Sequence, residues 1–182
     1  RDLNVPLLAI ISRMDVQKGI DLAFTALKSM KSINFQAVIL GTGDPKLEEA
    51  ARALQTAFPE KIKVEVRFDA ALARQIYAGA DMLLMPSRYE PCGLAQMIAM
   101  RYGCVPVARA AGGLKDTVRH NETGFIFEKA HHMSLMGAVK NAIKVYGDKE
   151  AWQKIQLAGM AQDFSWEASA RDYLKLYLSL VK

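Results

Sequence analysis

The sequence has 182 residues, of which 51% are hydrophobic and 24% charged, and its formal net charge is +5. This length is sufficient for one domain with a substantial core, and the composition excludes an intrinsically disordered chain. The basic balance favours anionic ligands, but there are no Lys/Arg blocks and no basic residues interleaved with aromatics, so we expect no nucleic-acid partner. No apolar run reaches membrane-spanning length, and we expect no membrane partner.

The cysteines and the first residue bear on the cellular setting. Cys92 and Cys104 lack the spacing of a disulfide framework, and no segment resembles a signal peptide. We therefore expect a reducing compartment, either a cytoplasm or a plastid stroma after removal of a transit peptide. The chain begins at Arg1 without a methionine, and we interpret it as a fragment of a longer protein.

The first predicted unit is a strand, a polar loop and a helix. The apolar run at 5–11 predicts a strand covered on both faces, and apolar residues at helical spacing predict a helix over 20–30. The loop between them carries Arg13 and Lys18. Ligands of open α/β sheets bind at the carboxyl ends of the strands, so we expect both cations to face a binding crevice.

The second and third units repeat this plan. Residues 36–40 predict a strand, and Asp44 followed by Pro45 predicts the start of a helix that ends near Phe58. The turn Gly41-Thr42-Gly43 is not a dinucleotide fingerprint, because Lys46 stands where the third glycine is needed. A further strand over 62–68 and a helix over 71–78 follow.

The central unit is the stretch 82–100. Met82 to Met85 predict a short buried strand that Pro86 ends, because proline lacks the backbone donor of a continuing ladder. Pro91 then predicts the first turn of a helix. The free N–H groups of that turn would face the same crevice as Glu90 and suit an anionic group.

The remaining chain predicts two strands and three helices. The strands are 104–108 and 124–127, and the helices are 135–146, 149–160 and a terminal helix capped by Ser165. We expect the aromatic stripe of the terminal helix to pack on its own sheet, with the alternative that part of it covers a missing domain. Strands alternating with helices predict an α/β fold, a single three-layer Rossmann-like domain over 1–182 with a mostly parallel sheet.

The sequence lacks the motifs of metal sites, of nucleophilic catalysis and of phosphate-binding loops. His131 and His132 are adjacent and point apart on a helix, and His120 is isolated, so we predict no metal site. There is no carboxylate cage, no nucleophile elbow and no P-loop. Cys92 has no partner base for covalent catalysis, and we expect its small side chain to pack behind the phosphate turn. A carboxylate beside two cations suits a ligand with a diphosphate end and a hydroxyl-rich end, which describes a nucleotide sugar.

Motifs along the whole chain resemble the C-terminal half of bacterial glycogen synthases and plant starch synthases. The matching motifs, in order, are Ser12-Arg13-x4-Lys18-Gly19, Gly41-Thr42-Gly43-Asp44, Pro86-Ser87-Arg88-Tyr89-Glu90-Pro91-Cys92-Gly93-Leu94, Arg101-Tyr102-Gly103, Gly112-Gly113-Leu114-x-Asp116-Thr117-Val118, Thr123-Gly124-Phe125 and Asp163-Phe164-Ser165-Trp166. The resemblance implies the C-terminal half of a two-domain GT-B retaining glycosyltransferase. Such enzymes transfer glucose from ADP-glucose to the non-reducing end of an α-1,4-glucan.

The resemblance also implies a role for each matching residue. Arg13 and Lys18 would bind the donor diphosphate, Glu90 the glucose hydroxyls, and the backbone amides of Gly93 and Leu94 the distal phosphate. Phe68 would lie beside the adenine, where related enzymes often have a tyrosine. The remaining predicted substrate-binding residues are Cys92, Gln96, Gly43, Gly112 and Gly113. Related transferases have a second glutamate eight residues after the first; here Ile98 stands at that place.

The family pattern places the acceptor groove mainly in an N-terminal domain, which this chain does not include. We therefore expect the isolated chain to bind donor weakly and to be nearly inactive. The resemblance implies no cofactor besides the ADP-glucose donor. It also implies a location in the bacterial cytoplasm or the plant plastid stroma. Two alternatives stay open: a transferase of the same fold that uses a UDP- or GDP-sugar, or a non-catalytic nucleotide-binding module.

Overall fold

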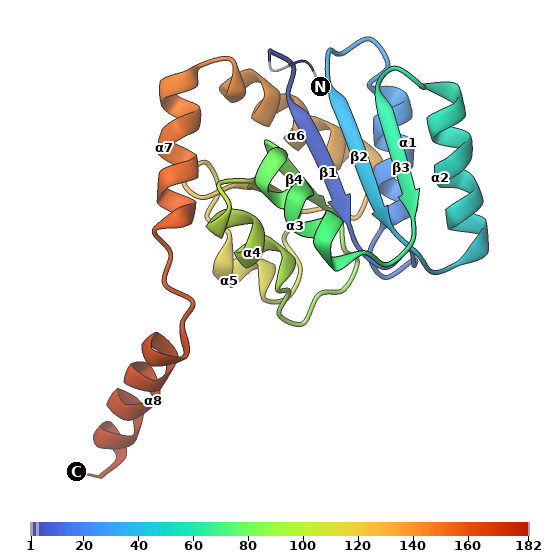
Figure 1. The fold of residues 1–182 in the computed structure, drawn as a ribbon. Helices are drawn as coiled ribbons and strands as arrows, with labels where there is room; N and C mark the ends of the chain where they lie inside the picture. Colours follow the sequence, from blue (N-terminus) through green and yellow to red (C-terminus); the bar gives the residue numbers. More distant parts are fainter. Residues whose placement is uncertain (1, 3, 182) are drawn as a thin grey trace.

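The computed structural model describes residues 2 and 4–181 and has a parallel sheet with helices on both faces (Figure 1). The ends of the predicted domain, Arg1 and Lys182, lie outside the described residues. The strands are β1 (Leu7–Ile11), β2 (Gln36–Gly41), β3 (Ile62–Val66), β4 (Met82–Met85), β5 (Val105–Arg109) and β6 (Phe125–Phe127). The helices are α1 (Ile20–Ser29), α2 (Pro45–Ala57), α3 (Ala70–Gly79), α4 (Ala95–Arg101), α5 (Leu114–Thr117), α6 (His132–Tyr146), α7 (Lys149–Met160) and α8 (Trp166–Leu180).

The six strands lie in the order β3-β2-β1-β4-β5-β6, and every neighbouring pair is parallel. This confirms the predicted α/β fold and parallel sheet. The chain builds the sheet outward from β1 in one direction and then from β4 in the other, so the strand order reverses between β1 and β4. Such a topological switch point opens a crevice at the carboxyl edge of the sheet.

Alternating side chains of the strands build two core layers. Leu8 and Ile10 of β1 pack in the layer that contains buried residues of α1, α2, α6 and α7. Ala9 between them packs in the opposite layer, with buried residues of α3, α4 and α5. Because successive residues of a strand point to opposite faces, one short apolar run serves both layers. The predicted three-layer architecture is therefore present.

Helix starts follow the local capping signals. The Asp44 side chain accepts a hydrogen bond from the backbone N of Lys46 at 2.8 Å, with Pro45 in the first turn of α2. The Ser165 hydroxyl oxygen accepts one from the backbone N of Ala168 at 3.2 Å and caps α8. Both predicted caps are confirmed, because each side chain satisfies a backbone donor that the helix leaves free.

The start of α4 corrects one prediction. Pro91 does not lie in the first turn of this helix, which begins at Ala95 after a turn over residues 91–94. Gly93 in that turn has φ +78°, a left-handed conformation that ends any helical path through it. A proline fits the first turn of a helix, but it also fits a non-helical turn, and the sequence pattern does not distinguish the two.

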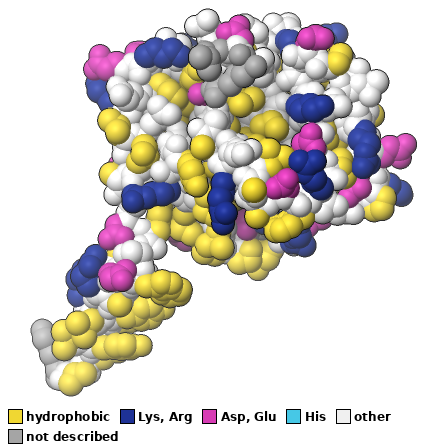
Figure 2. Space-filling view, in the orientation of Figure 1, with side chains coloured by type: hydrophobic (Ala, Val, Ile, Leu, Met, Phe, Trp, Pro, Cys, Tyr) yellow, Lys and Arg dark blue, Asp and Glu magenta, His cyan; other side chains and the backbone are white. Residues whose placement is uncertain are grey.

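The terminal helix corrects a second prediction. None of the described residues of α8 is buried, and Trp166 is 88% exposed. Figure 1 shows α8 extending away from the body of the domain, and Figure 2 shows hydrophobic side chains gathered along it. The expectation that α8 packs on its own sheet is wrong. An apolar stripe predicts that a face needs a cover, but it does not say which surface covers it.

Deleting residues 166–182 is expected to leave the melting temperature of the remaining chain within about 2 °C, because α8 contributes no buried residue to either core layer. The deletion should also reduce self-association at high concentration, since it removes the exposed apolar face. Differential scanning calorimetry and light scattering check these results. A melting temperature lower by about 5 °C or more would contradict this placement of α8.

Candidate functional site

Two loops meet at the switch point. The loop over residues 12–19 follows β1, and the loop over residues 86–94 follows β4. The backbone N of Arg88 donates to the carbonyl oxygen of Gln17 at 2.7 Å, and the Gln17 side chain donates to the carbonyl oxygen of Tyr89 at 3.3 Å. Gly19 has φ +67°, and a side chain there would overlap the carbonyl oxygen of Pro86. The two loops are therefore held in direct contact.

A buried ion pair joins the two loops. The Lys18 ammonium lies 2.7 Å from Oε2 of Glu90, and the Ser87 hydroxyl donates to the same oxygen at 3.0 Å. Glu90 is only 5% exposed, and these two partners compensate for the water that its carboxylate loses. The sequence predicted that Lys18 and Glu90 face one crevice, and the structure brings the two side chains together.

The third predicted charge, Arg13, lies at the rim. Its side chain is 70% exposed, and Nη1 lies 3.3 Å from Oδ2 of Asp15. Asp15 also accepts a hydrogen bond from the backbone N of Lys18 at 2.8 Å, which fixes the turn between the two cations. The loop thus presents one solvent-accessible guanidinium and one ammonium that is already paired.

Two arginines that sequence reasoning missed support the loop after β4. Arg88 forms a two-pronged contact with Asp21 of α1 at 2.7 Å for each prong, which holds the pKa of the Asp21 carboxyl below its ordinary value. Arg109 donates to the carbonyl oxygens of Ser87 and Arg88, each at 2.7 Å. The feature that could have indicated this contact is the position of Arg109 at the carboxyl end of β5, which neighbours β4 in the sheet.

Both loops line one cavity, and the loop over residues 12–19 also lines a smaller cavity beside it. The larger has a volume of about 530 Å³ and the smaller about 220 Å³, and both are lined by Ser12, Arg13 and Phe68. Of the predicted site residues, the larger cavity is lined by Arg13, Lys18, Phe68, Glu90, Gly93 and Leu94. Phe68 is 86% exposed, so its ring offers an open face for stacking. The cations and the buried carboxylate therefore share one crevice that continues into a smaller pocket.

The other predicted substrate-binding residues lie behind the loops. Gly43 pairs with Met14, directly beneath the Arg13 loop. Gly112 and Gly113 lie against the loop after β4, and the backbone N of Gly113 donates to the carbonyl oxygen of Glu90 at 3.2 Å. Cys92 lies in the same loop and is exposed, so the expectation that its side chain packs behind the turn is wrong; Gln96 is buried beneath the loop. The cavity-lining set does not include these five residues, and their roles as ligand contacts stay predictions.

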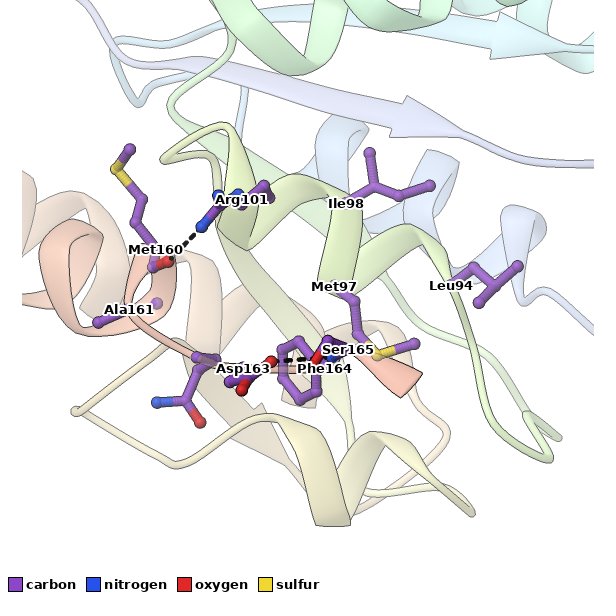
Figure 3. Close-up of a pocket in the computed structure, with 11 residues that line it drawn as sticks. Leu94, Met97, Ile98, Arg101, Met160, Ala161, Asp163, Phe164 and Ser165 are labelled. Atoms are coloured by element: carbon purple, nitrogen blue, oxygen red, sulfur yellow. Dashed lines mark hydrogen bonds between the residues drawn. The ribbon is translucent and has the colours of Figure 1, made fainter. Parts of the chain in front are cut away.

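A third cavity, of about 590 Å³, lies on another side of α4 (Figure 3). Leu94 and Ile98 line both this cavity and the 530 Å³ cavity. Its charged side chains are engaged at its edges: Arg101 donates to the carbonyl oxygen of Met160 at 3.3 Å, and Asp163 pairs with Arg171 at 3.3 Å. It is lined largely by apolar side chains and lacks the cluster of charges found between the loops.

The two cysteines differ in reactivity. Cys92 is exposed in the loop, whereas Cys104 is buried, and burial raises the pKa of the Cys104 thiol far above its ordinary value. Iodoacetamide at mildly alkaline pH is therefore expected to alkylate Cys92 alone in the folded chain and both thiols in denaturant. Mass spectrometry checks this result, with Cys92→Ser as the unlabelled control. Native labelling of Cys104 would contradict its place in the core.

Two features are absent from the described residues. No group of three or more histidine, cysteine or acidic residues there is arranged to hold a metal ion. Within the same part of the chain, no helix has the length and apolarity needed to cross a membrane.

Comparison with known proteins gives close relatives. Glycogen synthase from Kosmotoga olearia is 48% identical over 181 residues, which cover 96% of this chain and 38% of that protein. Glycogen synthase from Anaeromyxobacter sp. strain Fw109-5 is 47% identical over 97% of this chain and 38% of its own length. The chain thus spans about 38% of the length of these relatives.

Solved structures agree with the fold. The catalytic domain of starch synthase IV from Arabidopsis thaliana, bound to ADP and acarbose, matches with a TM-score of 0.88 at 34% identity, over 98% of this chain and 39% of that chain. The fold is the Rossmann-like domain of GT-B glycosyltransferases. The family model described as glycosyl transferases group 1 matches residues 1–156, which is most of the chain. The chain therefore belongs to the glycosyl transferases group 1 family.

Proposed function

We propose that this chain is the donor-binding half of a retaining glucosyltransferase that moves glucose from ADP-glucose to the non-reducing end of an α-1,4-glucan. One observation carries the proposal: at the switch point, two cations and one buried carboxylate line a single cavity. The similarity to glycogen synthases and to an ADP-bound starch synthase supports adenine as the base and glucan as the acceptor.

Each end of the donor has a matching group in the proposed arrangement. The diphosphate lies against Arg13 and Lys18, whose charges compensate its own. The distal phosphate also accepts from the backbone N–H groups of Gly93 and Leu94. The sugar lies against Glu90, because an ionised carboxylate accepts hydrogen bonds from hydroxyls. The adenine lies beside Phe68, which lines both the 530 Å³ cavity and the smaller 220 Å³ cavity next to it.

The same groups also stabilise the transition state of glucose transfer. When the bond between glucose C1 and the distal phosphate breaks, negative charge grows on the departing ADP. Fixed cations at that place stabilise the developing charge more than they stabilise the bound donor, and this difference lowers the barrier. Glu90 holds the glucose while its anomeric carbon loses the phosphate. The oxygen of the acceptor's 4-hydroxyl bonds to C1 on the face that ADP leaves, as a retaining reaction requires, and the hydroxyl proton passes to the departing phosphate oxygen.

The proposal includes a second domain that completes the acceptor side. Two features of this chain support it: the chain matches 38% of the length of its glycogen synthase relatives, and α8 leaves an apolar face without a cover. Alone, the chain is expected to bind donor weakly and to transfer little glucose.

Glucan extension by the full-length protein tests the proposed function. The protein is incubated with maltohexaose and either ADP-glucose or UDP-glucose carrying labelled glucose, and the lengthened chains are counted. The expected result is transfer from ADP-glucose at a clearly higher rate. Transfer from UDP-glucose alone would favour another transferase of the same fold. No transfer from either donor would favour a non-catalytic nucleotide-binding module.

A further inference from the structure

The Gln96 side chain is a fully buried polar group beneath the loop after β4. Gln96 is 0% exposed, although it lies in the first turn of the short helix α4. Its Nε2 group lies 2.9 Å from the carbonyl oxygen of Gly93 and 3.2 Å from that of Cys92, and it donates to both. A buried amide whose NH₂ group donates to neighbouring carbonyl oxygens restrains the backbone that carries them.

The same amide also connects the turn to α5. Nε2 of Gln96 lies 3.0 Å from Oγ1 of Thr117, and this hydroxyl donates to the carbonyl oxygen of Gly113 at 2.9 Å. The backbone N of Gly113 in turn donates to the carbonyl oxygen of Glu90 at 3.2 Å. One amide therefore links the turn at 91–94 with the segment that contacts the backbone of Glu90.

The orientation of the amide is set by its partners. The carbonyl oxygens of Cys92 and Gly93 only accept hydrogen bonds, so the NH₂ group must face them and Oε1 must face away. Oε1 is buried and has no hydrogen-bond partner among the described residues. It lies against Gly93, where an added Cβ would come within 2.5 Å of it. The hydrogen bonds of the Gln96 side chain are therefore all made by its NH₂ group.

The turn that Gln96 holds keeps two donors free. Gly93 has φ +78°, and both Gly93 and Leu94 line the 530 Å³ cavity. Their backbone N–H groups donate to no acceptor among the residues that the structure describes. Because Gln96 engages the carbonyl oxygens on the other side of this turn, it stabilises the conformation in which these N–H groups stay available to a ligand.

We propose that Gln96, supported by Thr117, is a positioning residue that presents the backbone amides of Gly93 and Leu94 to the distal phosphate of the donor. The inference rests on the proposed function, which supplies that ligand. Gln96 acts from behind the turn and does not line the cavity. Its loss should therefore weaken the grip on the second phosphate and leave the binding of a nucleoside monophosphate unchanged.

The test compares ADP with AMP by NMR titration of the full 182-residue chain. Gln96→Met keeps the side-chain length and removes both donors. We expect the dissociation constant for ADP to rise by about tenfold, the scale of one or two lost charge-assisted hydrogen bonds, with that for AMP within about twofold of wild type. Thr117→Val should shift the ADP constant in the same direction by a smaller factor, and it serves if Gln96→Met does not fold.

Gln156→Met is the matched control. The Gln156 side chain also donates to the carbonyl oxygen of a left-handed glycine, Gly103, at 2.7 Å, but neither residue lines the cavity. This variant should keep the wild-type ratio of ADP to AMP affinity. An unchanged ratio in both Gln96→Met and Thr117→Val, or an equal loss for both nucleotides, would overturn the positioning role. If the wild-type chain binds neither nucleotide, the proposed function itself fails.

Discussion

Replacing Lys18 with alanine is expected to lower the turnover of the full-length enzyme by about 10²- to 10³-fold, the range seen when one preorganised donor to a developing anion is removed. Lys18 lies 2.7 Å from Glu90 within the cavity, and its loss removes the charge that the proposed function places against the departing diphosphate. Steady-state kinetics with ADP-glucose and maltohexaose measure the effect. Arg13→Ala should act in the same direction.

Lys28→Ala is the control for Lys18→Ala, because Lys28 is an exposed lysine in the last turn of α1. It should keep wild-type turnover. Since Lys18→Ala also leaves Glu90 without its counter-charge, the unfolding free energy of each variant is measured in urea at the assay temperature. A folded Lys18→Ala enzyme with normal turnover would contradict the assignment of this lysine to the leaving group.

Replacing Glu90 with glutamine is expected to change binding and turnover in opposite directions. The carboxylate holds the Lys18 ammonium at 2.7 Å, so its neutralisation frees a full positive charge for a diphosphate. We expect ADP to bind several-fold more tightly to the isolated chain, by about 1 kcal/mol, the upper end of the range for a solvent-exposed ion pair. Glucose transfer by the full-length enzyme should fall by about 10²-fold or more, because the sugar loses its charged acceptor.

Glu150→Gln provides the comparison for Glu90→Gln. Glu150 also pairs with a lysine, Lys154 at 2.8 Å, but this pair is exposed on α7 and far along the chain from the cavity-lining residues. Its neutralisation should leave ADP affinity and turnover unchanged. Weaker ADP binding in Glu90→Gln would mean that Glu90 does not compete with the diphosphate for Lys18.

The meeting of Lys18 and Glu90 was predictable from the sequence. Each follows a short apolar strand, and the carboxyl ends of neighbouring parallel strands lie at one edge of the sheet. The sequence does not state that β1 and β4 are neighbours; the strand order of the structure shows it. The distance between the two charges was not predictable, because it depends on the loop contacts between residues 12–19 and 86–94.

The missed features depend on contacts between distant segments. Arg109 donates to two carbonyl oxygens about twenty residues earlier in the chain, and Arg88 pairs with Asp21 across the switch point. No local pattern marks either contact, since an arginine at the end of a strand fits a solvent-exposed site equally well. The start of α4 was misplaced for a local reason, because Pro91 fits both a helix start and a turn.

For α8, the sequence predicted the bounds of the helix but not its packing. Its boundaries and its Ser165 cap follow from local chemistry and were predicted closely. Its packing was predicted wrongly, because no surface of the described chain covers Trp166 or Tyr173. Local propensity fixes a helix, whereas burial depends on a surface that the sequence of that helix does not contain.

The most direct measurement is an NMR titration of the wild-type chain with ADP, UDP, ADP-glucose and UDP-glucose. The central claim is that the two loops at the switch point form the donor site. It predicts saturable binding that prefers adenine nucleotides, with shifts at Gly93, Leu94 and the residues around Lys18. Binding that shifts only residues away from these loops, or no binding at millimolar ligand, would contradict it.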